Sequence, residues 1–145
     1  MNLREDQNSK RHHSHADTSY GHLLHRVQEV TGLKNREKAE VAFLVSLEGL
    51  LRGIPPAEAM HILAQLPLIV RDELRTFAVG PDKDVSARAI KSELQSRLQL
   101  NELEAAAMLP SICSLLANSL SASLVTALRT NLPADMKGLF PISRD

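Results

Sequence analysis

Aromatic residues are nearly absent from this chain of 145 residues: they make up 3% of it, and tryptophan is missing. The core must therefore be filled by leucine, isoleucine, valine, alanine and methionine, because hydrophobic residues still reach 43%. Together with the many Glu, Lys, Arg and Gln residues, these are good helix formers. A charged share of 23% is typical of a folded globular protein. The composition predicts an all-α fold.

The chain also lacks an excess of charge of either sign. Seventeen basic residues balance seventeen acidic ones, which removes the electrostatic argument for a nucleic-acid partner or an anionic membrane. The single cysteine, Cys113, excludes an internal disulfide and suits a reducing compartment. Residues 1–8 have no apolar core of a signal peptide. We therefore expect a cytoplasmic protein that binds neither nucleic acid nor membrane.

One long segment carries no charge: Asp, Glu, Lys and Arg are all missing from Ala105 to Leu128. Its length is close to the roughly 20 residues of a membrane span. However, it contains Pro110, Asn118 and several serines, which make it too polar for hydrocarbon, so we expect no transmembrane helix. A surface helix normally carries charges on its outer face. Two alternatives follow: the segment is buried inside the monomer, or its outer face contacts another protein.

Hydrophobic periodicity predicts six helices behind a polar tail. Residues 1–18 have no apolar period, and we expect them to form a disordered tail. Gly32 is expected to end the first helix, whereas Pro67 and Pro110 are expected to kink the third and the fifth. The six helices are predicted to begin near Tyr20, Asn35, Pro56, Asp84, Asn101 and Ser121.

The two halves of the chain align without a gap when the first is shifted by about 66 positions. Asn35 then falls on Asn101, and Pro67 falls on Pro133. A fixed internal period indicates stacked units that share a core. We therefore predict a helical domain of two tandem three-helix repeats, packed as a six-helix bundle or a short superhelix. The predicted boundaries are 19–141 for the domain, about 20–77 for the first repeat and about 84–140 for the second.

Several short motifs follow one another in order over roughly residues 20–141. They are Ala57-Glu58-Ala59, Ala64-Gln65-Leu66-Pro67, Arg71, Leu132-Pro133-Ala134-Asp135 and Leu139-Phe140-Pro141. With these motifs the chain resembles a bacterial family known as domain of unknown function 2267. In that family an aromatic tract and a tryptophan usually follow the first Leu-Pro helix. This chain lacks them and has Leu-Arg-Thr-Phe-Ala at the corresponding residues 74–78. The resemblance implies a helical fold and no agreed activity.

Histidines are concentrated near the N-terminus, at His12, His13, His15, His22 and His25. Neutral imidazole binds zinc, copper and nickel, and His22 and His25 are spaced to share one helical face. Yet no Cys, Asp or Glu stands at a recognised ligand spacing, and a flexible tail loses entropy when it binds. We expect a solvated tail and no metal or other cofactor. The alternative is a metal- or pH-responsive protein whose histidine tail docks on the helical body.

Catalytic signatures are missing as well. The sequence has no glycine-rich phosphate loop, nucleophile elbow or carboxylate dyad, and Cys113 has no charge near it in the sequence that would favour a thiolate. We therefore expect no enzymatic activity. The sequence favours a helical module that acts by protein–protein contact, with a homodimer as its simplest assembly. The candidate interaction residues are placed on the outer faces of the fifth and sixth helices: Leu115, Leu116, Leu120 and Leu124.

Overall fold

The computed structural model describes residues 19–140, and these form helices and connecting turns without a strand among them. The all-α prediction is confirmed, whereas the predicted tail, residues 1–18, lies outside the described part of the chain. The N-terminal helix covers residues 19–31. It is followed by α2 (Arg36–Arg52), α3 (Pro56–Ala64), α4 (Leu68–Leu74), η1 (Arg75–Phe77), α5 (Ala87–Leu98), α6 (Glu102–Ser119), α7 (Ala122–Asn131) and η2 (Ala134–Leu139).

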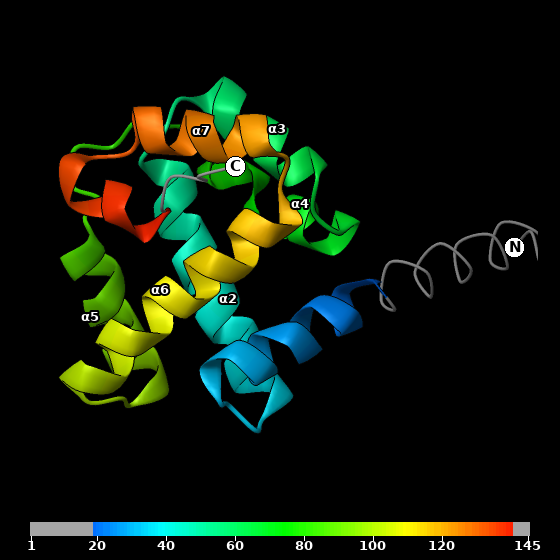
Figure 1. Ribbon diagram of the computed structural model, residues 1–145, viewed down its shortest axis with the longest axis vertical. Coiled ribbons are helices and arrows are strands. Elements are labelled where there is room, and N and C mark those ends of the chain that lie inside the picture. The colour runs from blue at the N-terminus through cyan, green and yellow to red at the C-terminus, as the bar shows by residue number, and fades with distance from the viewer. Residues whose placement is uncertain (1–18, 141–145) are drawn as a thin grey trace, which may run out of the picture.

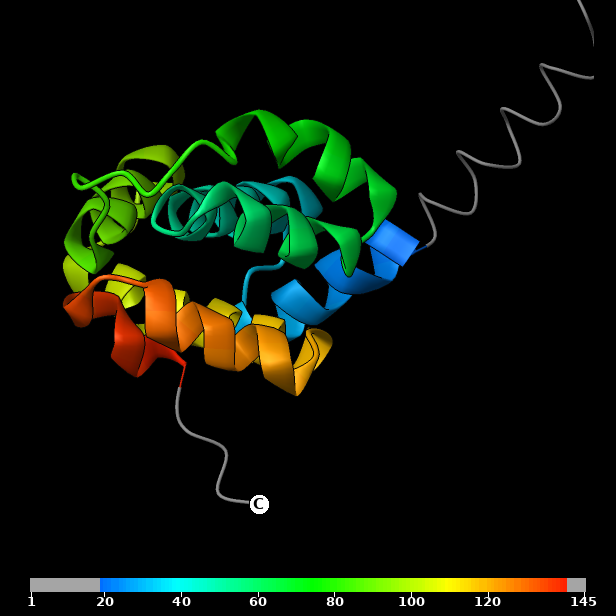
Figure 2. The same ribbon diagram turned by 90° about the horizontal axis from the view of Figure 1, so that it is seen from above.

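Helix α2 lies at the centre of the structure. It contacts α3, α4, α5, α6 and η1, and Figure 1 shows α6 crossing in front of it. Seen from above, α2 and α3 lie between green α4 on one side and orange α7 on the other (Figure 2). Because neighbours surround α2, its buried residues extend around most of its circumference. They are Ala39, Ala42, Phe43, Val45, Ser46, Leu47, Leu50 and Leu51.

Local signals determine where several helices begin and end. The side chains of Asn35, Asn101 and Ser121 accept backbone N–H groups in the first turns of α2, α6 and α7, as predicted. At α6 the Glu104 carboxylate also accepts the backbone N–H of Asn101 at 3.0 Å, which completes a capping box. Gly32 has a φ of +78° just after the N-terminal helix, the conformation expected of a glycine at this place.

Two predicted helix features are wrong. The third helix does not kink at Pro67 but divides there, so α3 ends at Ala64 and α4 begins at Leu68. Proline has no N–H to donate, and its ring is incompatible with a helical residue in front of it. Asp84 is also not a cap: Ser86 accepts the Ala89 N–H and begins α5. At Pro110, by contrast, α6 continues through the proline as one helix.

Two polar contacts join segments that lie far apart in the sequence. Gln65, at the end of α3, accepts the backbone N–H of Ser121 at 2.8 Å. Asp135 in η2 accepts the backbone N–H of Ala87 at 2.9 Å. This carboxylate satisfies an N–H of the first turn of α5 and places a negative charge at the positive end of that helix. The two contacts hold α7 against α3 and η2 against α5.

Helices α2 and α5 are tightly packed at Gly49. A Cβ atom at this position would lie 2.5 Å from Cγ1 and 2.6 Å from Cδ1 of Ile90, far inside van der Waals contact. Ile90 is itself buried, and Cγ1 is bonded directly to Cβ of a β-branched side chain, whose χ1 rotation is restricted. The absence of a side chain at Gly49 is therefore what allows α5 to pack against α2.

Gly49→Ala should lower the free energy of unfolding by about 1 kcal/mol. The overpacking cost, about 1–3 kcal/mol, exceeds the gain in helix propensity of about 1 kcal/mol. In an Ile90→Ala background the same substitution should instead raise the free energy of unfolding by up to about 1 kcal/mol, because the clashing atoms are gone. Urea unfolding of the four proteins measures both effects. An effect of equal sign and size in both backgrounds would show that Ile90 does not set the spacing of the helices.

Asn101→Ala should lower the free energy of unfolding by about 1–2 kcal/mol, because α6 loses its N-cap acceptor and Glu104 loses its reciprocal partner. Asn101→Ser keeps a side-chain oxygen at the cap and should change the same quantity by only a few tenths of a kcal/mol. Thermal and urea unfolding compare the two variants. Equal losses for alanine and serine would mean that the cap does not stabilise α6.

Candidate functional site

The four leucines proposed as an interaction surface are buried in the core of the chain itself. Leu115 and Leu116 on α6 are 3% and 1% exposed, and Leu120 and Leu124, at the junction with α7, are 8% and 7% exposed. Their side chains are therefore not available on an outer face. The prediction is corrected in this respect: of the two alternatives left by the charge-free segment, internal burial applies to these leucines.

The outward side of α6 is formed by other residues of the same segment. Ala107, Pro110, Ser114 and Asn118 are exposed, and their spacing of three and four residues places them along one face of the helix. Leu103 begins this row in the first turn, and its side chain is 81% exposed. We call these five residues the outer row of α6. It has no charged residue and contains one large apolar side chain.

Exposed residues without charge also lie on α7 and at the end of α3. Ser123 and Thr126 are exposed on α7, and Gln65 at the end of α3 contacts Ser121 through both its amide oxygen and its amide nitrogen. The exposed large hydrophobic residue Met60 lies on the adjoining α3. By comparison, α5 exposes a charged series along its length: Arg88, Glu93 and Arg97.

A groove of about 310 Å³ lies beside the outer row, between the end of the N-terminal helix and the first half of α6. Its surface is about half apolar and half polar. Glu104 is the one charged residue of the lining, and its carboxylate accepts the Asn101 N–H. Ala107 belongs to both the groove and the outer row. The lining residues are Val30, Thr31, Gly32, Leu33, Leu100, Glu104, Ala107, Met108 and Ser111.

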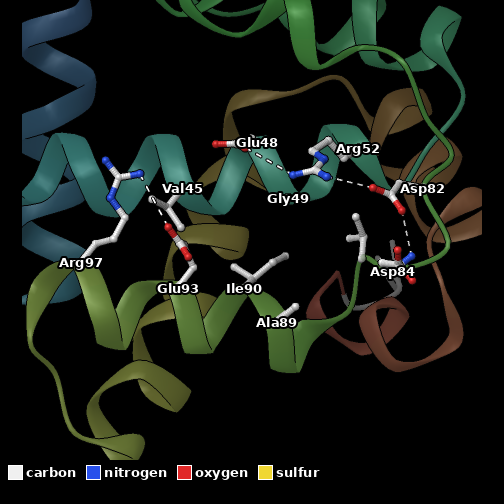
Figure 3. A pocket seen from close by; sticks show the side chains of 11 residues that line it. Val45, Glu48, Gly49, Arg52, Asp82, Asp84, Ala89, Ile90, Glu93 and Arg97 are labelled. Atoms are coloured by element: carbon white, nitrogen blue, oxygen red, sulfur yellow. Dashed lines mark hydrogen bonds and ion pairs between the residues drawn. The ribbon is translucent and has the colours of Figure 1, made fainter.

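A second hollow, about 330 Å³ in volume, lies between α2 and α5, with Gly49 and Ile90 in its lining (Figure 3). Charged side chains surround it. Arg52 contacts Asp82 at 2.9 Å and Glu48 at 3.6 Å, while Arg97 contacts Glu93 at 3.8 Å. These pairs are partly exposed to water, where such contacts add little to stability. The hollow is therefore polar and solvated, and the arginines within it already have carboxylate partners.

One acidic group of this second hollow, the carboxylate of Asp82, is stabilised in its charged form. The Asp84 backbone N–H donates to Asp82 at 2.9 Å. This hydrogen bond, followed by the contact with Arg52, lowers the pKa of Asp82 below its ordinary value. Asp82 thus remains ionised over the physiological range and holds the segment before α5 against the end of α2.

Cys113 lies on the inner side of α6 and is fully buried. Burial raises the pKa of its thiol to about 12, because an apolar environment disfavours the thiolate. This agrees with the expectation of an unreactive cysteine. The thiol fills space in the core and takes no part in a surface site.

The two described histidines of the N-terminal group, His22 and His25, are exposed. His25 lies 3.0 Å from Glu29 on the same helix. His12, His13 and His15 fall outside the described residues. Within residues 19–140, no group of three or more His, Cys, Asp or Glu side chains is arranged to hold a metal ion. The described part of the chain also contains no helix with the length and apolarity needed to cross a membrane.

Sequence reasoning missed both Leu103 and the groove. Leu103 stands between Glu102 and Glu104 and outside the inward series of Ala105, Leu109 and Ile112, so its exposure could have been read from the helical period. The groove left no comparable signal, because it joins residues 30–33 to residues 100–111.

Comparison with known proteins places the chain in a family. A search of curated proteins found no match. The family described as "Uncharacterized conserved protein (DUF2267)" matches residues 20–139, most of the chain and nearly all of its described helices. The motifs around Pro67 and Pro133 thus led to the correct group, and the chain belongs to the DUF2267 family.

Proposed function

We propose that this chain is a non-enzymatic helical module of the cytoplasm that acts by protein–protein contact, and that it associates with a second copy of itself. The observation that supports the proposal is the uncharged outward surface of α6 and α7. Between Ala105 and Leu128 its exposed positions carry alanine, proline, serine, asparagine and threonine, whereas the charges of α6 are confined to Glu102 and Glu104 in its first turn. Depletion of charge is typical of the centre of an interface between proteins.

A two-fold dimer suits a surface without charge. In such a dimer the same patch of each copy faces the other, so residues near the axis meet their own equivalents. A charged residue there would face a like charge at the cost of repulsion. Ser114, in the middle of the outer row, avoids this cost, and its small side chain permits a close approach of two helices.

The outward face of α6 is too small to form a stable dimer interface by itself. Helix α6 has 18 residues and is therefore roughly 27 Å long. One face of a helix of this length covers less than the roughly 800 Å² that each partner contributes to a stable interface. The proposed contact therefore includes α7 or the end of the N-terminal helix beside the outer row.

We also propose that the chain consists of two tandem three-helix units, about 20–77 and 84–140. The helix starts support this division, because α6, α7 and η2 each begin 66 residues after α2, α3 and α4, respectively. Each unit would leave one side of its helices uncovered, and their association buries these sides in a shared core.

Ser114→Arg should weaken the dimer at least about tenfold in Kd, because each dimer then holds two like charges at the contact, an arrangement that costs at least about 1.4 kcal/mol. Ser92→Arg is the matched control, since Ser92 is also an exposed serine within a helix, α5. Sedimentation equilibrium of both variants gives the two dissociation constants, and circular dichroism checks the fold. Equal dissociation constants, or a wild-type chain that is monomeric throughout, would overturn the proposal.

A further inference from the structure

Leu103 is an apolar side chain held at a fixed position in water. At 81% exposure it is the most exposed large hydrophobic residue of the described chain. It belongs to the first turn of α6, which the reciprocal Asn101–Glu104 hydrogen bonds hold in place. Because its backbone is already ordered, covering this side chain costs little conformational entropy. Any apolar cover supplied by a partner therefore favours association.

The groove next to Leu103 offers such a cover on a second copy. Its volume of about 310 Å³ is several times the roughly 30 Å³ that a water molecule occupies, so it has space for a leucine side chain. Val30, Leu100 and Met108 supply apolar walls. Ala107, one turn after Leu103, forms the edge of the groove. The exposed leucine and the groove are therefore neighbours on one surface.

Charges beside the two features are of opposite sign. Glu102 precedes Leu103 and is exposed, while Lys34 follows Leu33 of the groove and is exposed too. When Leu103 of one copy faces the groove of another, the acidic group next to the leucine approaches the basic group next to the groove. Glu104 keeps its negative charge in the groove lining, but its carboxylate is held at the start of α6 by the Asn101 N–H, 3.0 Å away.

We propose that Leu103 of each chain inserts into the groove of a second copy, so that two identical contacts form about one twofold axis. A knob and a groove on the same surface satisfy both contacts with a single rotation. This inference rests on the self-association proposed above and names the contact that specifies it. Residues 1–18 are a weaker occupant of the groove, because they are mostly polar.

Leu103→Asp should raise the Kd of the dimer at least about tenfold, because it replaces an apolar contact with Val30, Leu100 and Met108 by a carboxylate. The fold should remain intact, since an acidic residue in the first turn of a helix is favourable. Val79→Asp is the matched control: Val79 is 73% exposed and lies between η1 and α5, away from the groove. It should leave the Kd unchanged. Sedimentation equilibrium of the full-length proteins measures all three.

Ala107→Trp provides the complementary test, because it fills the groove and leaves Leu103 in place. We expect this variant to raise the Kd of the dimer about as much as Leu103→Asp does. A dimer broken by Ala107→Trp but not by Leu103→Asp would show that another segment fills the groove, and the reciprocal contact would be wrong. A dimer broken by Ser114→Arg but by neither of these variants would keep the self-association and overturn this contact. A monomeric wild-type chain would overturn both.

Discussion

Burial of one side of α6 against its neighbours decides which residues of the charge-free segment reach the surface. The helix contacts α2, α5 and η2, and Leu109, Ile112 and Leu116 are almost completely withdrawn from water. Once this side faces inward, helical geometry places Pro110 and Ser114 outward. The packing that buries the leucines and the surface that lacks charge are thus two results of one constraint. The exposure of Leu103 belongs to the same orientation.

Two hollows in the described part of the chain differ in the charge of the residues around them. Around Gly49, between α2 and α5, the paired arginines and carboxylates are partly exposed to water. Their charges are already paired within the chain, so this surface does not need a partner protein to balance them. Beside Leu103 the only carboxylate in the lining is bound within its own helix. Apolar cover contributes more there than at a charged rim, since desolvating ionised groups is costly. The contrast favours the α6 surface as the site of association.

Local signals in the sequence were enough to locate several helix boundaries. Asn35 and Asn101 cap their helices through short-range hydrogen bonds, so their role does not depend on distant parts of the chain. The effect of Pro67 was harder to predict, because whether a proline kinks or ends a helix depends on how the surrounding packing satisfies the freed carbonyl groups.

The candidate surface could be predicted only in part. The missing charge between Ala105 and Leu128 was visible, but a segment without charges contains no marker of its solvent side. For that reason the sequence alone favours an outward position for Leu115 and Leu116, although both face the core. The groove joins segments about 70 residues apart, and only the tertiary structure brings them together.

Light scattering of the purified full-length chain over a concentration series tests self-association most directly. The proposed dimer predicts a mass that rises with concentration from 16.0 kDa, the mass of one chain, toward twice that value. The limiting mass should not pass the dimer, because a twofold contact uses the same surface on both copies and closes the assembly. A mass that stays at 16.0 kDa into the high micromolar range would contradict the proposal that the uncharged face of α6 and α7 joins two copies.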